Sequence, residues 1–128
     1  MEAPPRDARN GDFASRNSAS APAPVLDPAL AEVLRRLIAS YRPTRVYLFG
    51  SRARADAGLD SDYDLLLVVP DDAAPDRRGS RLAYQVLRGT GTAVDVLVCT
   101  RSYFEARLPL RASLPATVVR EGVLLHAA

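Results

Sequence analysis

Several residue types that build common functional sites are scarce in this sequence. The chain has one cysteine, Cys99, so it can form neither an internal disulfide nor a metal site with several cysteine ligands. Its one histidine, His126, argues against a histidine-rich zinc site and against a Ser-His-Asp triad. All 17 basic residues are arginine. The absence of lysine excludes chemistry that needs a lysine amine, such as a P-loop or a Schiff base.

Long apolar segments are missing as well. No run approaches the roughly 20 apolar residues that a membrane-spanning helix needs. The N-terminal segment also lacks the hydrophobic stretch of a secretion signal. The formal net charge is only +2, which is too small to indicate nucleic-acid binding by itself. We therefore expect a cytoplasmic protein with no membrane partner and no direct contact with nucleic acid.

What remains is the composition of one compact domain with an extension. The chain has 128 residues, of which 48% are apolar and 25% charged, as in ordinary globular proteins. Residues 1–24 are rich in Ala, Pro, Ser and Arg and have no helical or strand periodicity. Such a segment buries too little apolar surface to offset its ordering entropy. We predict a flexible tail over 1–24 and a folded domain over 25–128.

The apolar pattern of the domain predicts a small α/β or α+β sheet flanked by helices. Asp27 and Pro28 are typical of a helix N-terminus, and the helix should end before Pro43. A nearly continuous apolar run predicts a strand covered on both faces at 63–69, and the strand at 92–99 is also expected to be buried. The other expected elements are a strand at 45–49, a helical turn at 52–57, helices at 77–88 and 102–111, and a final strand at 123–125.

Three aspartates accompany the expected strands. Asp62 and Asp64 are two residues apart, so a strand would point both carboxylates to one face. Asp95 stands among apolar residues, where an isolated charge is costly. A divalent cation with oxygen ligands would compensate all three acids. Turn acids at 62 and 64, and an ion pair between Asp95 and an arginine, are the structural alternatives.

A second set of residues suits phosphate. Gly50 follows an apolar strand and allows close approach of a ligand to the backbone, while Ser51 adds a hydroxyl beside the N–H groups of the next turn. Arg52 and Arg54 lie in the same turn and can add charge-assisted contacts. These four residues are the candidate nucleotide-binding group.

In this arrangement the sequence resembles the polymerase β-like nucleotidyltransferases, and in particular their minimal nucleotidyltransferase (MNT) domains. Leu48–Ser51, ten further residues and then Asp62–Asp64 match the Gly-Ser-x10-Asp-x-Asp signature, and Asp95 matches the third carboxylate. The segment Arg120–His126 is similar to the end of such domains, so the resemblance covers residues 26–126. Ala55 departs from the pattern, because these domains often carry glycine there.

The resemblance implies a fold, cofactors and roles. The fold would be a short mixed sheet with helices packed against it. Asp62 and Asp64 would hold two Mg²⁺ ions, with Asp95 completing one metal site and helping to deprotonate the acceptor hydroxyl. Ser51 and nearby backbone N–H groups would bind the phosphates of a nucleoside triphosphate such as ATP.

The resemblance also implies a partner. About 30 residues follow Asp95, too few for a helical acceptor-binding domain, so we expect another chain to carry the acceptor. MNT proteins occur as antitoxins of HEPN ribonuclease toxins, and some transfer AMP to tyrosine hydroxyls of the toxin. The leading hypothesis is such an antitoxin. The alternatives are an antitoxin that acts by binding alone and a small-molecule transferase of the aminoglycoside type.

Overall fold

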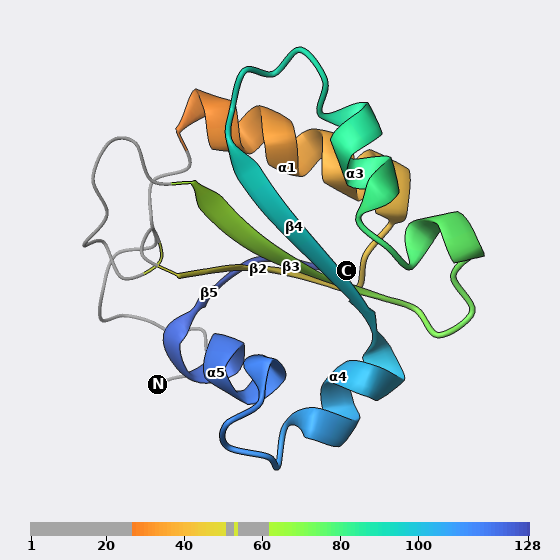
Figure 1. The fold of residues 1–128 in the computed structure, drawn as a ribbon, viewed down its shortest axis with the longest axis vertical. Coiled ribbons are helices and arrows are strands. Elements are labelled where there is room, and N and C mark those ends of the chain that lie inside the picture. Colours follow the sequence, from red (N-terminus) through yellow and green to blue (C-terminus); the bar gives the residue numbers. More distant parts are fainter. Residues whose placement is uncertain (1–26, 51–52, 54–61) are drawn as a thin grey trace, which may run out of the picture.

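One mixed sheet with helices on both faces makes up the domain (Figure 1). A computed structural model describes residues 27–50, 53 and 62–128. In this part of the chain the strand order is β4-β3-β2-β5, with β2 antiparallel to β3 and β5, and β3 parallel to β4. The predicted α+β architecture is confirmed. The strands are β2 (Arg45–Phe49), β3 (Tyr63–Val69), β4 (Val94–Thr100) and β5 (Val123–Ala127).

Helix α1 (Pro28–Tyr41) covers one face of the sheet together with α3 (Arg81–Val86). The Asp27 carboxylate caps α1 by accepting a 2.7 Å hydrogen bond from the backbone N–H of Leu30. The helix ends at Arg42, which has a left-handed backbone, just before Pro43. Apolar side chains of α1 pack on inward-facing residues of β2, β3 and β4, and this layer is the larger core; its most buried members include Val33, Leu37, Val46, Leu65, Leu67 and Val69.

Helices α4 (Arg101–Arg107) and α5 (Leu114–Glu121) pack on the opposite face. Phe104 of α4 and Val118 of α5 are fully buried in a second, smaller core. The Phe104 ring stacks on Tyr47 of β2, with 5.7 Å between the ring centroids. Helix α4 begins where β4 ends, so the second layer lies toward one end of the sheet. None of the described helices has the length and apolar character needed to cross a membrane.

The helix expected at 77–88 is shorter than predicted. The chain instead forms a 3-10 turn, η1 (Pro75–Arg77), and then α3. The break falls at Gly79, whose carbonyl accepts a 2.6 Å hydrogen bond from the Tyr41 hydroxyl. The same hydroxyl accepts a 2.8 Å bond from the backbone N–H of Ala83 in α3. A tertiary contact to α1 therefore fixes the start of α3 at a position that local periodicity did not indicate.

The region after β4 contains two helices, and the sequence predicted one. The helix expected at 102–111 ends at Arg107, and α5 follows as a separate element. Ser113 caps α5 by accepting from the backbone N–H of Ala116 at 3.2 Å, and Pro115 occupies its first turn. Proline is favoured in the first turn of a helix, so Pro115 helps to start α5. The final strand is confirmed as β5, two residues longer than the run at 123–125.

The expectation of a buried third strand is wrong. In the described part of the chain, β4 lies at an edge of the sheet. Val96 is buried, but Asp95 and Leu97 on either side of it are exposed. An edge strand keeps one face open unless another layer covers it, and α4 reaches only its end. By contrast, β3 lies inside the sheet and is covered on both faces, as predicted.

Some expected elements lie outside the described residues. These are the tail at 1–24 and the helical turn at 52–57, of which only Ala53 is described, in helical conformation.

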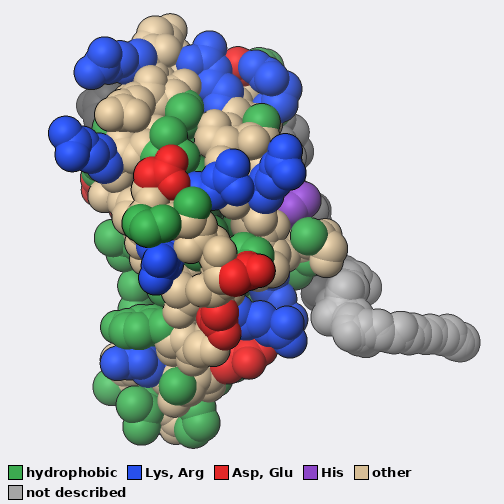
Figure 2. All heavy atoms as spheres, turned by 90° about the vertical axis from the view of Figure 1, so that its right-hand side faces the viewer, with side chains coloured by type: hydrophobic (Ala, Val, Ile, Leu, Met, Phe, Trp, Pro, Cys, Tyr) green, Lys and Arg blue, Asp and Glu red, His purple; other side chains and the backbone are tan. Residues whose placement is uncertain are grey.

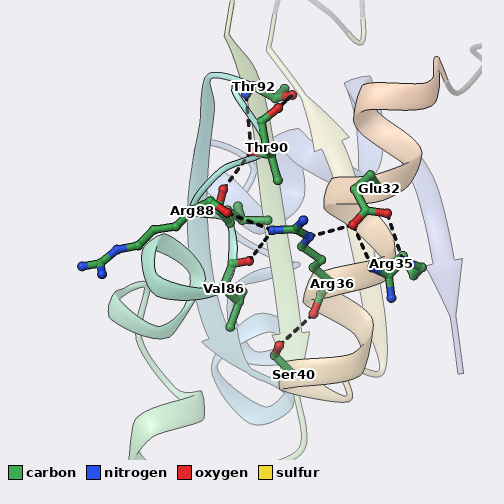
Figure 3. Close-up of polar contacts among 9 residues, drawn as sticks. Glu32, Arg35, Arg36, Ser40, Val86, Arg88, Thr90 and Thr92 are labelled. Carbon is green, nitrogen blue, oxygen red and sulfur yellow. Dashed lines mark hydrogen bonds and ion pairs between the residues drawn. The ribbon is translucent and has the colours of Figure 1, made fainter.

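A guanidinium group connects α1 to the chain entering β4 (Figure 3). Arg36 of α1 binds the Glu32 carboxylate at 2.7 Å and donates to the carbonyl oxygens of Val86 at 3.1 Å and Arg88 at 3.0 Å. Those carbonyls lie at and just beyond the end of α3, where helical partners are missing. Hydrogen bonds from Arg35 and then Arg36 lower the pKa of Glu32 to about 2. This contact holds the connection that delivers β4 to the sheet.

Replacing this arginine tests its role in folding. We predict that Arg36→Met lowers the free energy of unfolding by about 1–2 kcal/mol, because two backbone carbonyls lose their donor. Arg35→Met is the matched control, since Arg35 is exposed and, among the described residues, bonds only to Glu32. Urea unfolding followed by circular dichroism measures both variants. Equal losses in the two variants would contradict a specific role for Arg36.

Candidate active site

Two carboxylates meet on one face of the sheet through strand register. In the parallel pair β3–β4, Asp64 lies opposite Asp95. Side chains alternate across a strand, and the neighbours Leu65 and Val96 point into the core beneath α1. Asp64 and Asp95 therefore project on the other face, the one that carries α4 and α5. The register brings together two of the three predicted acids.

Gly50 adjoins Asp64 from the neighbouring strand. It directly follows Phe49, which is the antiparallel partner of Asp64. Its backbone has a φ of +77°, and a Cβ added there would collide with the Asp64 carboxylate. Glycine is required here for its conformation and for the space beside the carboxylate. The group that comes close to Gly50 in this structure is the Asp64 carboxylate, and the predicted approach of a ligand to the Gly50 backbone stays a prediction.

The electrostatic setting of Asp64 is unfavourable for a charge. Burial raises the pKa of Asp64, and the negative charges of Asp95 and Asp62 raise it further. Within the described ranges, no arginine forms an ion pair with Asp64 or Asp95. The structural alternative of an Asp95–arginine pair therefore has no support in this part of the chain.

Asp62 and Asp95 are both exposed, which corrects one step of the sequence argument. Asp95 was expected to be a buried charge that needs compensation, but its edge position leaves it in contact with water. Asp62 precedes β3 and lies outside the strand. The group that needs compensation is Asp64, half-buried between two like charges. The repulsion is therefore centred on Asp64, which lies two residues after Asp62 and opposite Asp95 in the strand pair.

The donor chemistry of this cluster suits a hard divalent cation. Carboxylate oxygens are the ligands that Mg²⁺ prefers, and a cation would relieve the mutual repulsion that raises the pKa of Asp64. Among the described residues, no three acidic, histidine or cysteine side chains are already gathered as metal ligands. The side chains of Asp62 and Asp95 are exposed, and exposed side chains change rotamer rapidly. The donor chemistry of the three residues therefore suits the cation.

The remaining predicted site residues lie outside the described part of the chain. Ser51, Arg52 and Arg54 follow Gly50 directly, but the structure does not describe them. The Gly50 carbonyl accepts a 3.1 Å hydrogen bond from the backbone N–H of Ala53. The phosphate-binding roles of these three residues stay predictions.

A family match accounts for this arrangement. Residues 29–124 match the nucleotidyltransferase domain family, and this range includes the whole sheet up to β5, Gly50 and all three aspartates. The chain belongs to this family. The fold of a nucleotidyltransferase domain, which the resemblance to MNT domains implied, is thereby confirmed.

Solved structures of other proteins were compared with this nucleotidyltransferase domain. A protein from Sulfolobus solfataricus, provisionally described as a nucleotidyltransferase, is 24% identical with a TM-score of 0.52, over 77% of this chain and 78% of that chain. That likeness concerns the fold. A toxin–antitoxin structure with AMP-PNP is 22% identical with a TM-score of 0.49, over 76% of this chain and 73% of that chain. No curated protein gave a significant match.

Sequence reasoning missed one neighbour of the acids. Leu97 follows Asp95 by two residues and shares its face of β4, so it belongs to the surface beside the site. The period of two was the available signal. A strand buried as a whole, as predicted at 92–99, leaves no exposed face, so this prediction gave no reason to single out Leu97.

Two glycine substitutions separate backbone strain from crowding at Asp64. Gly50 and Gly89 both have positive φ, +77° and +84°, but a Cβ at Gly89 would meet nothing within 4 Å. Gly89→Ala should cost about 1 kcal/mol from strain alone. Gly50→Ala should cost more and should abolish metal-dependent nucleotide binding, because it displaces the Asp64 carboxylate. Equal effects on stability, with nucleotide binding intact in both variants, would contradict the close packing of Gly50 and Asp64.

The raised pKa of Asp64 predicts that replacing this aspartate with a neutral residue increases the free energy of unfolding, and that the increase depends on pH. A folded-state pKa above the unfolded value near 3.8 means that the folded chain binds this proton more tightly. The contribution of Asp64 to stability is then present below about pH 3.8 and lost as the pH rises through the folded pKa. In metal-free buffer, Asp64→Asn should therefore be more stable than the wild type at neutral pH, with the difference vanishing toward about pH 4.

Urea unfolding at a series of pH values measures this effect. Asp72→Asn is the control, because Asp72 is an exposed aspartate in the loop after β3 and outside the carboxylate cluster. A variant at position 64 that is no more stable than the wild type at neutral pH would contradict the electrostatic description of the cluster.

Proposed function

We propose that this nucleotidyltransferase domain is a Mg²⁺-dependent enzyme that transfers AMP from ATP to a hydroxyl of a partner protein in the cytoplasm. The observation that carries the proposal is the pairing of Asp64 with Asp95 beside Gly50. Two carboxylates therefore lie beside a glycine at the end of a strand, where a ligand could come close to the backbone. The membership of the family supports nucleotidyl transfer in general.

The side chains of this domain would mainly position the substrates and help to neutralise their charge. Asp62 and Asp64, with Asp95 completing one site, would hold two magnesium ions. When bound, these ions supply a positive charge that polarises the α-phosphate and neutralises the attacking and leaving oxygens. Asp95 would accept the proton of the acceptor hydroxyl. A bond forms between the acceptor oxygen and the α-phosphorus, the bond from that phosphorus to the bridging oxygen breaks, and pyrophosphate leaves.

The triphosphate would lie over the segment after Gly50. Ser51 and the backbone N–H groups next to it would bind the terminal phosphates, and Arg52 and Arg54 would add bidentate contacts. Charge-assisted contacts of this kind orient the α-phosphate toward the carboxylates, which is most of what a phosphoryl or nucleotidyl transfer asks of a protein.

The proposed partner is a HEPN ribonuclease toxin, and the acceptor is one of its tyrosine hydroxyls. This assignment rests on the sequence resemblance to MNT antitoxins. It makes this chain an antitoxin that neutralises the ribonuclease by modifying it.

Transfer of label tests the enzymatic proposal. The full chain is incubated with Mg²⁺, a candidate HEPN ribonuclease and ATP labelled at the α-phosphate. We expect label on the ribonuclease, none after chelation of Mg²⁺, and a loss of about 100-fold or more in Asp64→Asn and Asp95→Asn, as for loss of a group that stabilises developing charge. Asp72→Asn is the matched control and should retain activity.

A second readout separates modification from masking. If no label reaches protein and Asp64→Asn still neutralises the ribonuclease, then the chain acts by binding and the enzymatic proposal is wrong. Label on a small hydroxylated molecule such as an aminoglycoside, with none on protein, would contradict the assignment of a protein acceptor.

A further inference from the structure

An apolar groove lies on the same sheet face as the candidate catalytic acids. It encloses about 620 Å³, a size typical of ligand pockets, and it runs between the edge strand β4, helix α4 and the start of α5. In the lower part of the face drawn in Figure 2, apolar side chains gather on the left with arginines among them, and acidic side chains lie to their right. The residues that line the groove include Leu66, Leu97, Cys99, Tyr103, Arg107 and Leu114.

Strand register makes the groove continuous with the acids. The Asp64–Asp95 pair is followed two residues later by the pair of Leu66 and Leu97, which lines the groove. Two residues of a parallel strand span about 7 Å, which is comparable to the length of an aromatic side chain. A ring resting on the leucine pair would therefore bring a group at its far end to the carboxylates.

The walls of the groove remain open to solvent. Leu97 is 46% exposed and Tyr103 48% exposed, although neighbouring Leu66 is buried in the second core. Exposed apolar groups that adjoin a pocket mark interaction surfaces. Cys99 adds no reactivity, because burial raises the pKa of its thiol to about 11.

The charged groups of the groove are both cationic. The guanidinium of Arg107 lies 3.6 Å from the centroid of the Tyr103 ring, and Arg78 lines the same groove. No acidic residue lines it among the described residues. An occupant that combines apolar and acidic groups would match these walls.

We propose that this groove docks the acceptor segment of the partner protein, and that this segment is apolar and acidic and presents its tyrosine ring over Leu66 and Leu97. The inference rests on the proposed function for the identity of the reaction. It adds the surface that selects the acceptor. A glutamate or aspartate beside the tyrosine pairs with Arg107 or Arg78, while apolar neighbours cover Leu97 and Leu114.

Charge also argues against a second copy of this chain as the occupant. A symmetric dimer through this face would use the same patch on both subunits. Arg78 and Arg107 would then face a patch with no acidic residue among its described lining, and their charges would stay unpaired or repel. A foreign acidic segment has no such penalty.

Peptide binding tests the groove without requiring catalysis. The full 128-residue chain, labelled with ¹⁵N, is titrated with a synthetic peptide of the sequence Glu-Leu-Glu-Tyr-Leu-Glu and with its lysine counterpart, Lys-Leu-Lys-Tyr-Leu-Lys. We expect the acidic peptide to shift the amide signals of Leu97, Tyr103 and Leu114, and to bind at least 10-fold more tightly than the lysine peptide at low salt.

Matched variants assign the contacts. Leu97→Glu and Arg107→Glu should each weaken binding of the acidic peptide at least 10-fold. Arg107→Glu should also reduce the difference in affinity between the acidic peptide and the lysine peptide. Leu124→Glu is the control for Leu97, because Leu124 is 49% exposed on the opposite edge strand, outside the groove. Arg111→Glu matches the charge change of Arg107→Glu and also lies outside the groove. Both controls should bind like the wild type.

The outcomes separate the groove from the reaction. Shifts that map elsewhere, or equal losses in groove and control variants, would overturn the docking assignment even if Asp64-dependent transfer occurs. Binding in the groove without any nucleotidyl transfer would leave the docking assignment standing and contradict the proposed function. Concentration-dependent dimerisation that Leu97→Glu abolishes, together with no peptide binding, would assign the groove to a second copy.

In the transfer assay, a docking groove predicts that a groove variant changes the KM for the protein acceptor but not the KM for ATP. Arg107→Glu should raise the KM for the protein acceptor at least 10-fold while the KM for ATP stays within about twofold, because only the acceptor contacts this surface. A parallel rise in both constants would indicate a distorted active site and would contradict a separate docking groove.

Discussion

The parallel pairing of β3 with β4 is the constraint on which the rest of the molecule depends. Parallel neighbours cannot be joined by a short hairpin, so the chain must leave the sheet and return. It does so through η1 and α3, and α3 packs beside α1. The contact of Arg36 with the carbonyls after α3 fixes that return path. Only when β4 enters in this register does Asp95 stand opposite Asp64.

This arrangement stores electrostatic repulsion in an otherwise apolar sheet. Asp64 lies at the start of an interior strand, at a position where an apolar residue is typical. The negative charges of two further carboxylates raise its pKa. The fold tolerates the charge because the residues of these strands that face the larger core, on the other side of the sheet, are all hydrophobic. Sites that bind cations commonly keep such repulsion in the absence of the ion, at some cost to stability.

Local sequence patterns predicted the interior of the fold better than its edges. The bounds of β2 and β3 agree with the apolar runs at 45–49 and 63–69, because an interior strand must be apolar on both faces. The strand at 92–99 has a similar run, but its place at the edge depends on strand order, which the run does not encode. The need for glycine at position 50 was predicted for a ligand, whereas its contact with Asp64 follows from the antiparallel register of β2 and β3.

The apolar run does not encode strand order. For this reason Asp95 was wrongly expected to be buried, and the exposed surface beside it was not predicted. Val94, Val96 and Val98 of β4 face the core under α1, and the residues between them face outward. Sequence periodicity alone predicts this alternation, but only the edge position decides that the outward set is open. One strand thereby carries an acid and, two residues on, the apolar wall of a groove. The proposed catalytic acids and the proposed docking groove share a face, and β4, which has no further strand beside it among the described residues, contributes Asp95 to the one and Leu97 to the other. Under this proposal a domain of this size needs no separate layer to hold an acceptor near its acids, since the uncovered face of β3 and β4 carries both the acids and the groove.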